Sequence, residues 1–119
     1  MAQPKLAAIA ERIAQLDWPL IHRATEADGF ATLPPILSPE ECAELSATYP
    51  VRERFRSRIE MARFRFGLGE YKYFAAPLPP LVAALRVSLY PRVVAIANEW
   101  MKALRMQLRF PETLDEFLQ

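Results

Sequence analysis

The stretch that decides the expected fold is IEMARFRF-GLG-EYKYFA, residues 59–75. Two runs with strand-like composition, residues 59–66 and 70–75, lie on either side of the loop Gly67-Leu68-Gly69. Strand-forming residues around a short glycine-containing loop are typical of a β-hairpin. The sequence therefore predicts an antiparallel hairpin in the middle of the chain.

Two registers of this hairpin fit the sequence. A three-residue loop with Gly69 in the left-handed conformation pairs Arg65 with Tyr71 and Arg63 with Tyr73, so that each arginine could stack on a tyrosine. A two-residue loop gives the alternative pairs Phe64–Tyr73 and Phe66–Tyr71. The sequence leaves the choice between them open.

Helices are expected before the hairpin. Apolar residues recur at helical spacing over residues 4–16. Asp17 is placed to cap a second helix that ends at Gly29, and Phe30–Leu33 is expected to form a short strand. Ser38 to Glu41 reads Ser-Pro-Glu-Glu, which is the pattern of a capping box.

The third helix, begun by that capping box, is expected to reach about Thr48 and to bury Cys42 and Leu45. Residues 51–58 are expected to form a short helical turn. In the alternative, an extended strand, Arg52, Arg54, Arg56 and Arg58 would share one face.

The C-terminal part is also expected to be helical. The proline-rich connector at 77–80 precedes a long apolar helical pattern that Pro91 interrupts, which predicts two helices or a kink. A last helix is expected to open at Phe110 and to stop at Gln119. The predicted fold class is α+β, mostly helical, with a short strand and one β-hairpin, in a single domain of 119 residues.

Composition excludes several classes of protein. The chain is 52% apolar with a net charge of +1, unlike a disordered segment. The single Cys excludes a disulfide framework within the chain and favours the cytoplasm. With one Cys and one His, a zinc site made of these residue types is also excluded. The sequence shows no uninterrupted apolar run of about 18 residues, so no membrane span is expected.

Charge is concentrated in the middle of the chain. Residues 52–72 contain seven basic and three acidic side chains, whereas residues 1–51 contain three basic and seven acidic ones. Basic residues interleaved with aromatic ones can contact phosphates and stack on unpaired bases. The alternative is an ordinary sheet whose long side chains cover the core. The candidate residues are Arg56, Arg58, Arg63, Arg65, Tyr71, Lys72 and Tyr73.

Residue chemistry alone indicates no active site. His22 is expected to have a structural or surface role, and Cys42 to be a small buried apolar residue. Glu40, Glu41 and Glu44 are explained by their place near a helix N-terminus.

Several segments together resemble a known family. Residues 29–42 (GFATLPPILSPEEC) are similar to the opening of many 2-oxoglutarate/iron(II) oxygenases. Residues 55–74 (FRSRIEMARFRFGLGEYKYF), 77–82 (PLPPLV), 89–91 (LYP) and 97–100 (ANEW) are similar to the N-terminal half of a bacterial family of such oxygenases that demethylates damaged DNA. The resemblance implies a helical and hairpin region that flanks a double-stranded β-helix.

The chain departs from this family at the metal site. Such enzymes hold iron with a His-x-Asp/Glu…His triad, and His22 is the only histidine here. The resemblance implies that the catalytic core, the Fe(II) ligands and the 2-oxoglutarate ligands lie beyond Gln119. We therefore expect no catalytic, metal or cofactor residue in this chain, and a truncated region that is inactive by itself.

The resemblance implies that the hairpin forms a wall on the substrate side of the enzyme. Its expected residues are Arg58, Arg63, Tyr71, Lys72 and Tyr73. The expected partners are a nucleic-acid substrate, the missing C-terminal half and, through exposed apolar surface, a second copy. One alternative is a stand-alone module that binds nucleic acid or another anion through the hairpin; another is a protein–protein interaction unit.

Overall fold

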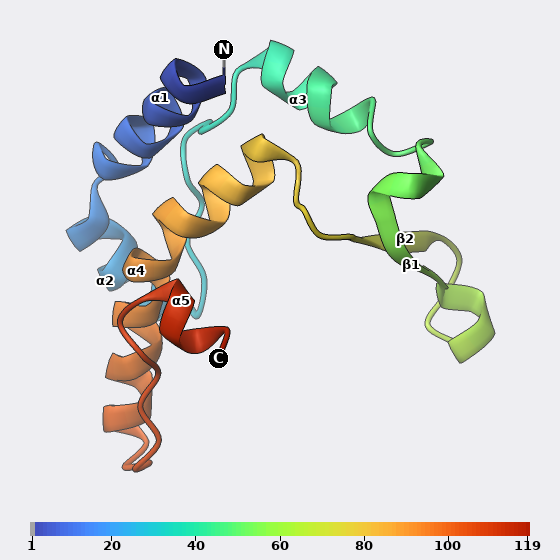
Figure 1. Ribbon diagram of the computed structural model, residues 1–119. Helices are drawn as coiled ribbons and strands as arrows, with labels where there is room; N and C mark the ends of the chain where they lie inside the picture. Colours follow the sequence, from blue (N-terminus) through green and yellow to red (C-terminus); the bar gives the residue numbers. More distant parts are fainter. Residues whose placement is uncertain (1) are drawn as a thin grey trace. The chain divides into compact units, whose positions relative to one another are not determined.

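The computed structural model describes residues 2–119, which divide into two compact units. The described residues of one unit are 2–36 and 82–119, and those of the other are 37–81. Figure 1 gives the course of the chain. Helices dominate and a two-stranded antiparallel sheet is present, which confirms the α+β class.

The first unit begins with α1 (Ala2–Ala14) and α2 (Trp18–Asp28). The expected cap of α2 is confirmed, because the Asp17 side chain accepts a hydrogen bond from the Leu20 backbone N–H at 3.1 Å. The helix ends as predicted at Gly29, whose φ of 80° is readily adopted only by glycine.

Apolar side chains from the helices of this unit form its core. The buried residues are Ile9, Ile13, Trp18, Ile21 and Val94. The Trp18 indole N–H donates to the Ile13 carbonyl at 2.8 Å, which satisfies the polar atom of a buried ring. The Arg92 guanidinium lies 5.4 Å from the centre of the Trp18 ring.

The prediction of a short strand at Phe30–Leu33 is wrong. These residues form no regular secondary structure and pair with no strand in the described part of the chain. Pro34 and Pro35 follow and have no N–H to donate to a ladder. After these prolines, the Ile36 carbonyl accepts a hydrogen bond from Arg12 Nη1 at 2.7 Å.

The long apolar pattern forms one helix, α4 (Pro80–Ala103), with Pro91 inside it. The helix changes direction along its length in Figure 1, as expected for a proline that removes one backbone hydrogen bond. Of the two alternatives, a kink is correct and two separate helices are not. By length and composition α4 could cross a membrane, contrary to the sequence expectation, although core helices of soluble proteins meet the same criterion.

The last helix, α5 (Leu114–Phe117), is shorter than predicted and begins after its N-cap Thr113 rather than at Phe110. The Phe110 backbone is held elsewhere, because both its N–H and its carbonyl bond to the Asn98 side chain on α4, at 2.8 and 3.0 Å. The Tyr90 hydroxyl also donates to the Pro111 carbonyl at 2.7 Å. These bonds fix the C-terminal segment along α4.

The second unit opens with α3 (Pro39–Ser46), for which both bonds of the predicted capping box are present. The Glu41 carboxylate accepts from the Ser38 N–H at 2.8 Å, and Ser38 Oγ accepts from the Glu41 N–H at 3.2 Å. The capping box turns the Glu41 side chain inward, where it is buried. The expected burial of Cys42 is wrong: the thiol is exposed, since successive helical residues point about 100° apart.

The hairpin of this unit consists of β1 (Phe55–Glu60) and β2 (Glu70–Phe74), preceded by the 3-10 turn η1 (Arg52–Arg54). A second 3-10 turn, η2 (Met61–Phe64), lies between the strands. The predicted helical turn is therefore confirmed for 52–54 only, and residues 55–58 are extended.

Candidate functional site

The register of the hairpin differs from both predicted alternatives. The Cα partners are Phe55–Phe74, Ser57–Tyr73, Arg58–Lys72, Ile59–Tyr71 and Glu60–Glu70. Pairing begins at Glu60 rather than at Phe66, because residues 61–69 all belong to the connection between the strands. The Met61 N–H donates to the Gly69 carbonyl at 2.9 Å and closes this connection.

A β-bulge at Arg56 changes which residues of β1 lie on the same face of the hairpin. The register shifts between Phe55 and Ser57, so one extra residue stands on β1. Because directly paired residues share a face, the bulge places Phe55 on the same side as Arg58. The four arginines at 52, 54, 56 and 58 consequently do not form the single row that an unbroken strand would give.

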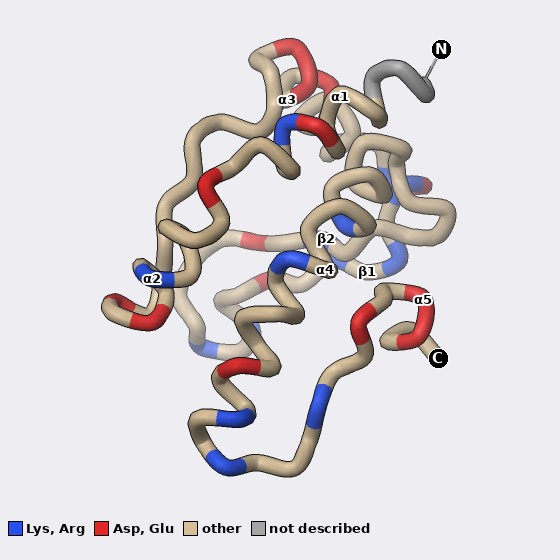
Figure 2. Tube along the Cα trace, turned by 90° about the vertical axis from the view of Figure 1, so that its left-hand side faces the viewer, with Lys and Arg blue, Asp and Glu red and all other residues tan. Residues whose placement is uncertain are grey.

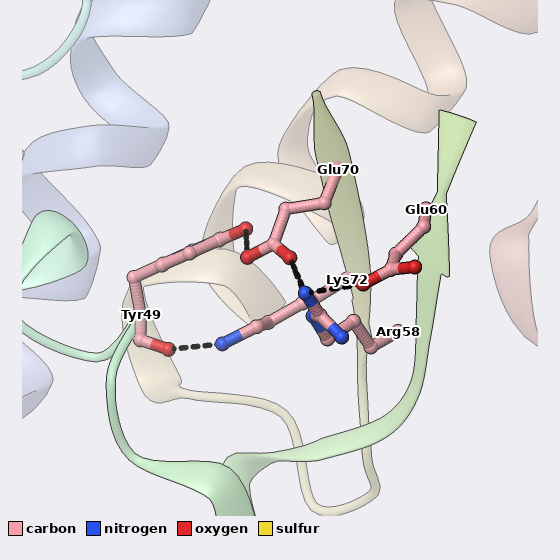
Figure 3. A network of polar contacts seen from close by, with 5 residues as sticks. All are labelled: Tyr49, Arg58, Glu60, Glu70 and Lys72. Carbon is pink, nitrogen blue, oxygen red and sulfur yellow. Dashed lines mark hydrogen bonds and ion pairs between the residues drawn. The ribbon is translucent and has the colours of Figure 1, made fainter. Parts of the chain in front are cut away.

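One face, called here the charged face, carries a network of polar contacts (Figure 3). The face consists of Phe55, Arg58, Glu60, Glu70, Lys72 and Phe74. The Arg58 guanidinium binds the Glu70 carboxylate and lies 2.9 Å from Oε1 of Glu60. The Tyr49 hydroxyl, from the segment before β1, donates to Glu70 Oε1 at 2.7 Å.

Lys72 is held on the same face by Tyr49 and Phe55. Its Nζ donates to the Tyr49 carbonyl at 2.8 Å and lies 4.0 Å from the centre of the Tyr49 ring. The Phe55 ring centre is 5.1 Å from the same ammonium, and Phe55 stacks on Phe74 at 4.9 Å. Lys72 is therefore a positioned cation, unlike a freely moving surface lysine.

The network shifts the acid–base equilibria of its members. The hydrogen bond from Tyr49, together with Arg58, lowers the pKa of Glu70 below its ordinary value of 4.5. The same hydrogen bond to Glu70 raises the pKa of Tyr49 above 10.0. Glu70 therefore stays ionised at neutral pH and keeps Arg58 in place.

The opposite face, called here the tyrosine face, consists of Ser57, Ile59, Tyr71 and Tyr73. Both tyrosines are exposed, and their rings meet edge to face with centroids 5.6 Å apart. The guanidinium of the bulged Arg56 lies 5.2 Å from the centre of the Tyr73 ring.

The predicted wall is thus divided between three places. Arg58 and Lys72 lie on the charged face, and Tyr71 and Tyr73 lie on the tyrosine face. Arg63 is exposed in η2, away from both strands. The structure keeps all five residues on one hairpin but does not bring them onto one surface.

A basic cavity lies beside β1. Its volume is about 530 Å³, and its lining includes four cations and no acidic residue. The lining residues are Arg52, Phe55, Arg56, Ser57, Arg58 and Lys72. Basic residues recur along this part of the chain in Figure 2, where Lys and Arg are blue. Such a cavity can attract an anion, and guanidinium groups suit phosphate oxygens because they offer several donors in a fixed plane.

Sequence reasoning missed Arg52, Tyr49 and Glu70 as members of this site. Arg52 could have been included from the sequence, because it begins the alternating series of arginines. Tyr49 and Glu70 carry no such signal, because their hydrogen bond joins residues 21 positions apart.

The described residues provide no evident metal site. Among residues 2–119 no group of three or more His, Cys, Asp or Glu side chains is placed to hold a metal ion. His22 is half-buried on α2, with no catalytic partner identified in the described structure.

Comparison with known families agrees with the resemblance seen in the sequence. Residues 69–119 match the model of a family described as "Oxygenase, catalysing oxidative methylation of damaged DNA". The match covers less than half of the chain and includes β2, the proline-rich connector, α4 and α5. Searches of curated proteins and of solved structures found no match.

Proposed function

We propose that this chain is the DNA-contacting N-terminal portion of a 2-oxoglutarate/iron(II)-dependent dioxygenase that acts on alkylated DNA. The observation that carries the proposal is the family match, which begins at the hairpin and names damaged DNA as the substrate. Tyr71, Lys72 and Tyr73 lie within the matched residues, and Arg58 faces Lys72 across the sheet.

The residues of this chain do not fit the iron or its cosubstrate. A facial triad needs two histidines and a carboxylate, and the sequence has one histidine. We therefore place the Fe(II) and 2-oxoglutarate ligands outside these 119 residues and derive no oxidative step here. In the proposed enzyme this portion binds and orients DNA and is inactive by itself. We also propose a cytoplasmic location, because the sequence has a single cysteine.

The basic cavity supplies the physical means of binding. Arg58 is held by two carboxylates, whereas Arg56, which also lines the cavity, has its guanidinium over the exposed ring of Tyr73. When Arg52 and Arg56 neutralise a DNA phosphate, they release the cations condensed on it. The binding constant should therefore fall with salt, with a slope of about −0.7 for each phosphate contacted on single-stranded DNA.

A salt titration tests DNA binding. Fluorescence anisotropy of a labelled single-stranded oligonucleotide, titrated with the chain at several NaCl concentrations, gives that slope. Arg56→Gln should reduce the magnitude of the slope by about 0.7. Arg54→Gln, which removes the same charge from a residue outside the cavity lining, should leave the slope unchanged. Absent or salt-independent binding would contradict the proposal.

The oxygenase assignment has its own test. Sequencing the encoding locus past codon 119 should show a reading frame that continues into a His-x-Asp/Glu motif and a later histidine. A stop codon directly after Gln119 would favour the stand-alone DNA-binding module, for which the same salt-dependent binding is expected.

A further inference from the structure

The connection between the strands contains a second, apolar cavity. Its volume is about 340 Å³, at the lower end of the range of small-ligand sites, ~300–1,000 Å³. The lining consists of Ile59, Met61, Phe64, Phe66 and Tyr71. Three of these five residues are aromatic, so the cavity offers flat surfaces to a ligand.

The aromatic lining is unusually exposed. Phe64 is 51% exposed and Phe66 is 74% exposed, and Tyr71 is also open to solvent. Exposed aromatic side chains gathered around one cavity are characteristic of a binding site, since each ring loses solvent contact only when a partner covers it.

The charge around this cavity defines the kind of partner. Residues 61–69 contain Arg63 and Arg65 and no acidic residue. A partner that combines a flat apolar ring with negative charge complements this segment.

The backbone holds Arg65 in a conformation that glycine normally supplies. Its φ is 61°, and it follows η2 with the hydrogen bonds of a helix C-terminal motif, Arg65 N–H to Ala62 and Phe66 N–H to Met61. A side chain at this position costs stability that glycine would avoid. Arg105, which follows α4, has nearly the same φ of 58° and the same pair of hydrogen bonds, so this conformation ends a helix and does not by itself indicate a ligand.

We propose that this cavity binds one unpaired base of single-stranded DNA, with Arg63 and Arg65 contacting the adjacent phosphates. The inference rests on the proposed function, because it assumes that the chain binds DNA. A base attached to its phosphates has both properties that the site selects, a flat aromatic ring and flanking negative charge. The basic cavity beside β1 then contacts the backbone, and the apolar cavity contacts the base.

Loss of a stacking surface tests the base contact. Phe66→Ala should weaken binding of a short single-stranded oligonucleotide about tenfold without changing the salt slope, since stacking on an aromatic ring adds affinity but no ion release. Leu68→Ala is the matched control: Leu68 is 91% exposed in the same segment and does not line the cavity, so affinity should not change.

An oligonucleotide of the same length that lacks bases throughout separates the two proposals. It should bind about tenfold more weakly than the normal oligonucleotide and with the same salt slope. Equal affinity for both would overturn the base site and leave the proposed function standing. Absence of salt-dependent binding to either would overturn the proposed function itself. Binding to anionic phospholipid vesicles but not to DNA would overturn both.

Arg65→Gly tests the arginine without risk to the fold. Glycine favours a φ of 61°, so the free energy of unfolding should be equal or higher. The affinity for the oligonucleotide should nevertheless fall, and the salt slope should lose about 0.7. Unchanged affinity and slope would remove Arg65 from the site.

Discussion

Arg58 on β1 binds the carboxylate of Glu70, which lies diagonally across the hairpin on β2. The residue directly opposite Arg58 in the register is Lys72. The direct pairs, Arg58–Lys72 and Glu60–Glu70, both bring like charges together, which alone would destabilise the sheet. The diagonal ion pair and the contact of Arg58 with Glu60 put these three charges beside opposite ones, whereas Lys72 is held by the Tyr49 carbonyl and by the rings of Tyr49 and Phe55. The like-charge pairs of the charged face are thus offset by contacts that its residues make with other partners.

The first prediction concerns acid. The lowered pKa of Glu70 means that its contribution to stability is fully present above its ordinary value of 4.5 and is lost as the pH falls through the lowered value. The protection factors of the amides of residues 55–60 and 70–74, which compare the exchange rates with the intrinsic rates at the same pH, should fall in that range. Glu70→Gln should exchange faster at neutral pH and lose this part of the pH dependence. A wild-type hairpin with unchanged protection at pH 2 would contradict the prediction.

A second prediction isolates the tyrosine. Tyr49→Phe removes the hydroxyl that makes the largest contribution to the lowered pKa of Glu70, so that pKa should rise toward 4.5. Carboxyl chemical shifts in an NMR titration give the value directly. Tyr71→Phe, on the opposite face, is the control and should leave the pKa of Glu70 unchanged.

A third prediction concerns the capping box of α3. Ser38→Ala removes the oxygen that accepts from the Glu41 N–H and should lower the free energy of unfolding by about 1 kcal/mol. Urea denaturation followed by circular dichroism measures the loss. Ser46→Ala, at the exposed end of the same helix, should change it by less than ~0.5 kcal/mol. Equal effects of the two substitutions would show that the cap contributes nothing.

A fourth prediction concerns the C-terminal segment. Asn98→Ala leaves the Phe110 N–H and carbonyl without their side-chain partner, and should cost about 1–3 kcal/mol. Asn98→Asp keeps the acceptor for the Phe110 N–H but sets a buried carboxylate oxygen against the Phe110 carbonyl, so at neutral pH its cost should be at least as large. Chemical denaturation of the three proteins checks this order, and an alanine variant as stable as wild type would contradict it.

The sequence by itself determined the local features of this protein. Asp17, Gly29 and the capping box from Ser38 to Glu41 were predicted correctly, because each depends on hydrogen bonds or dihedral angles within a few residues. The existence of a hairpin was also predictable, since its composition and its glycine loop are local signals.

The tertiary structure alone decided the register and the faces. The bulge at Arg56 and the long connection after Glu60 changed every predicted pair. A shift of one residue moves a side chain to the other side of a sheet, so the five wall residues could not be assigned to a surface in advance. The contact of Tyr49 with Glu70 joins distant positions and depends on which face β2 turns toward Tyr49. That orientation follows from packing over the whole unit, and no short stretch of sequence specifies it.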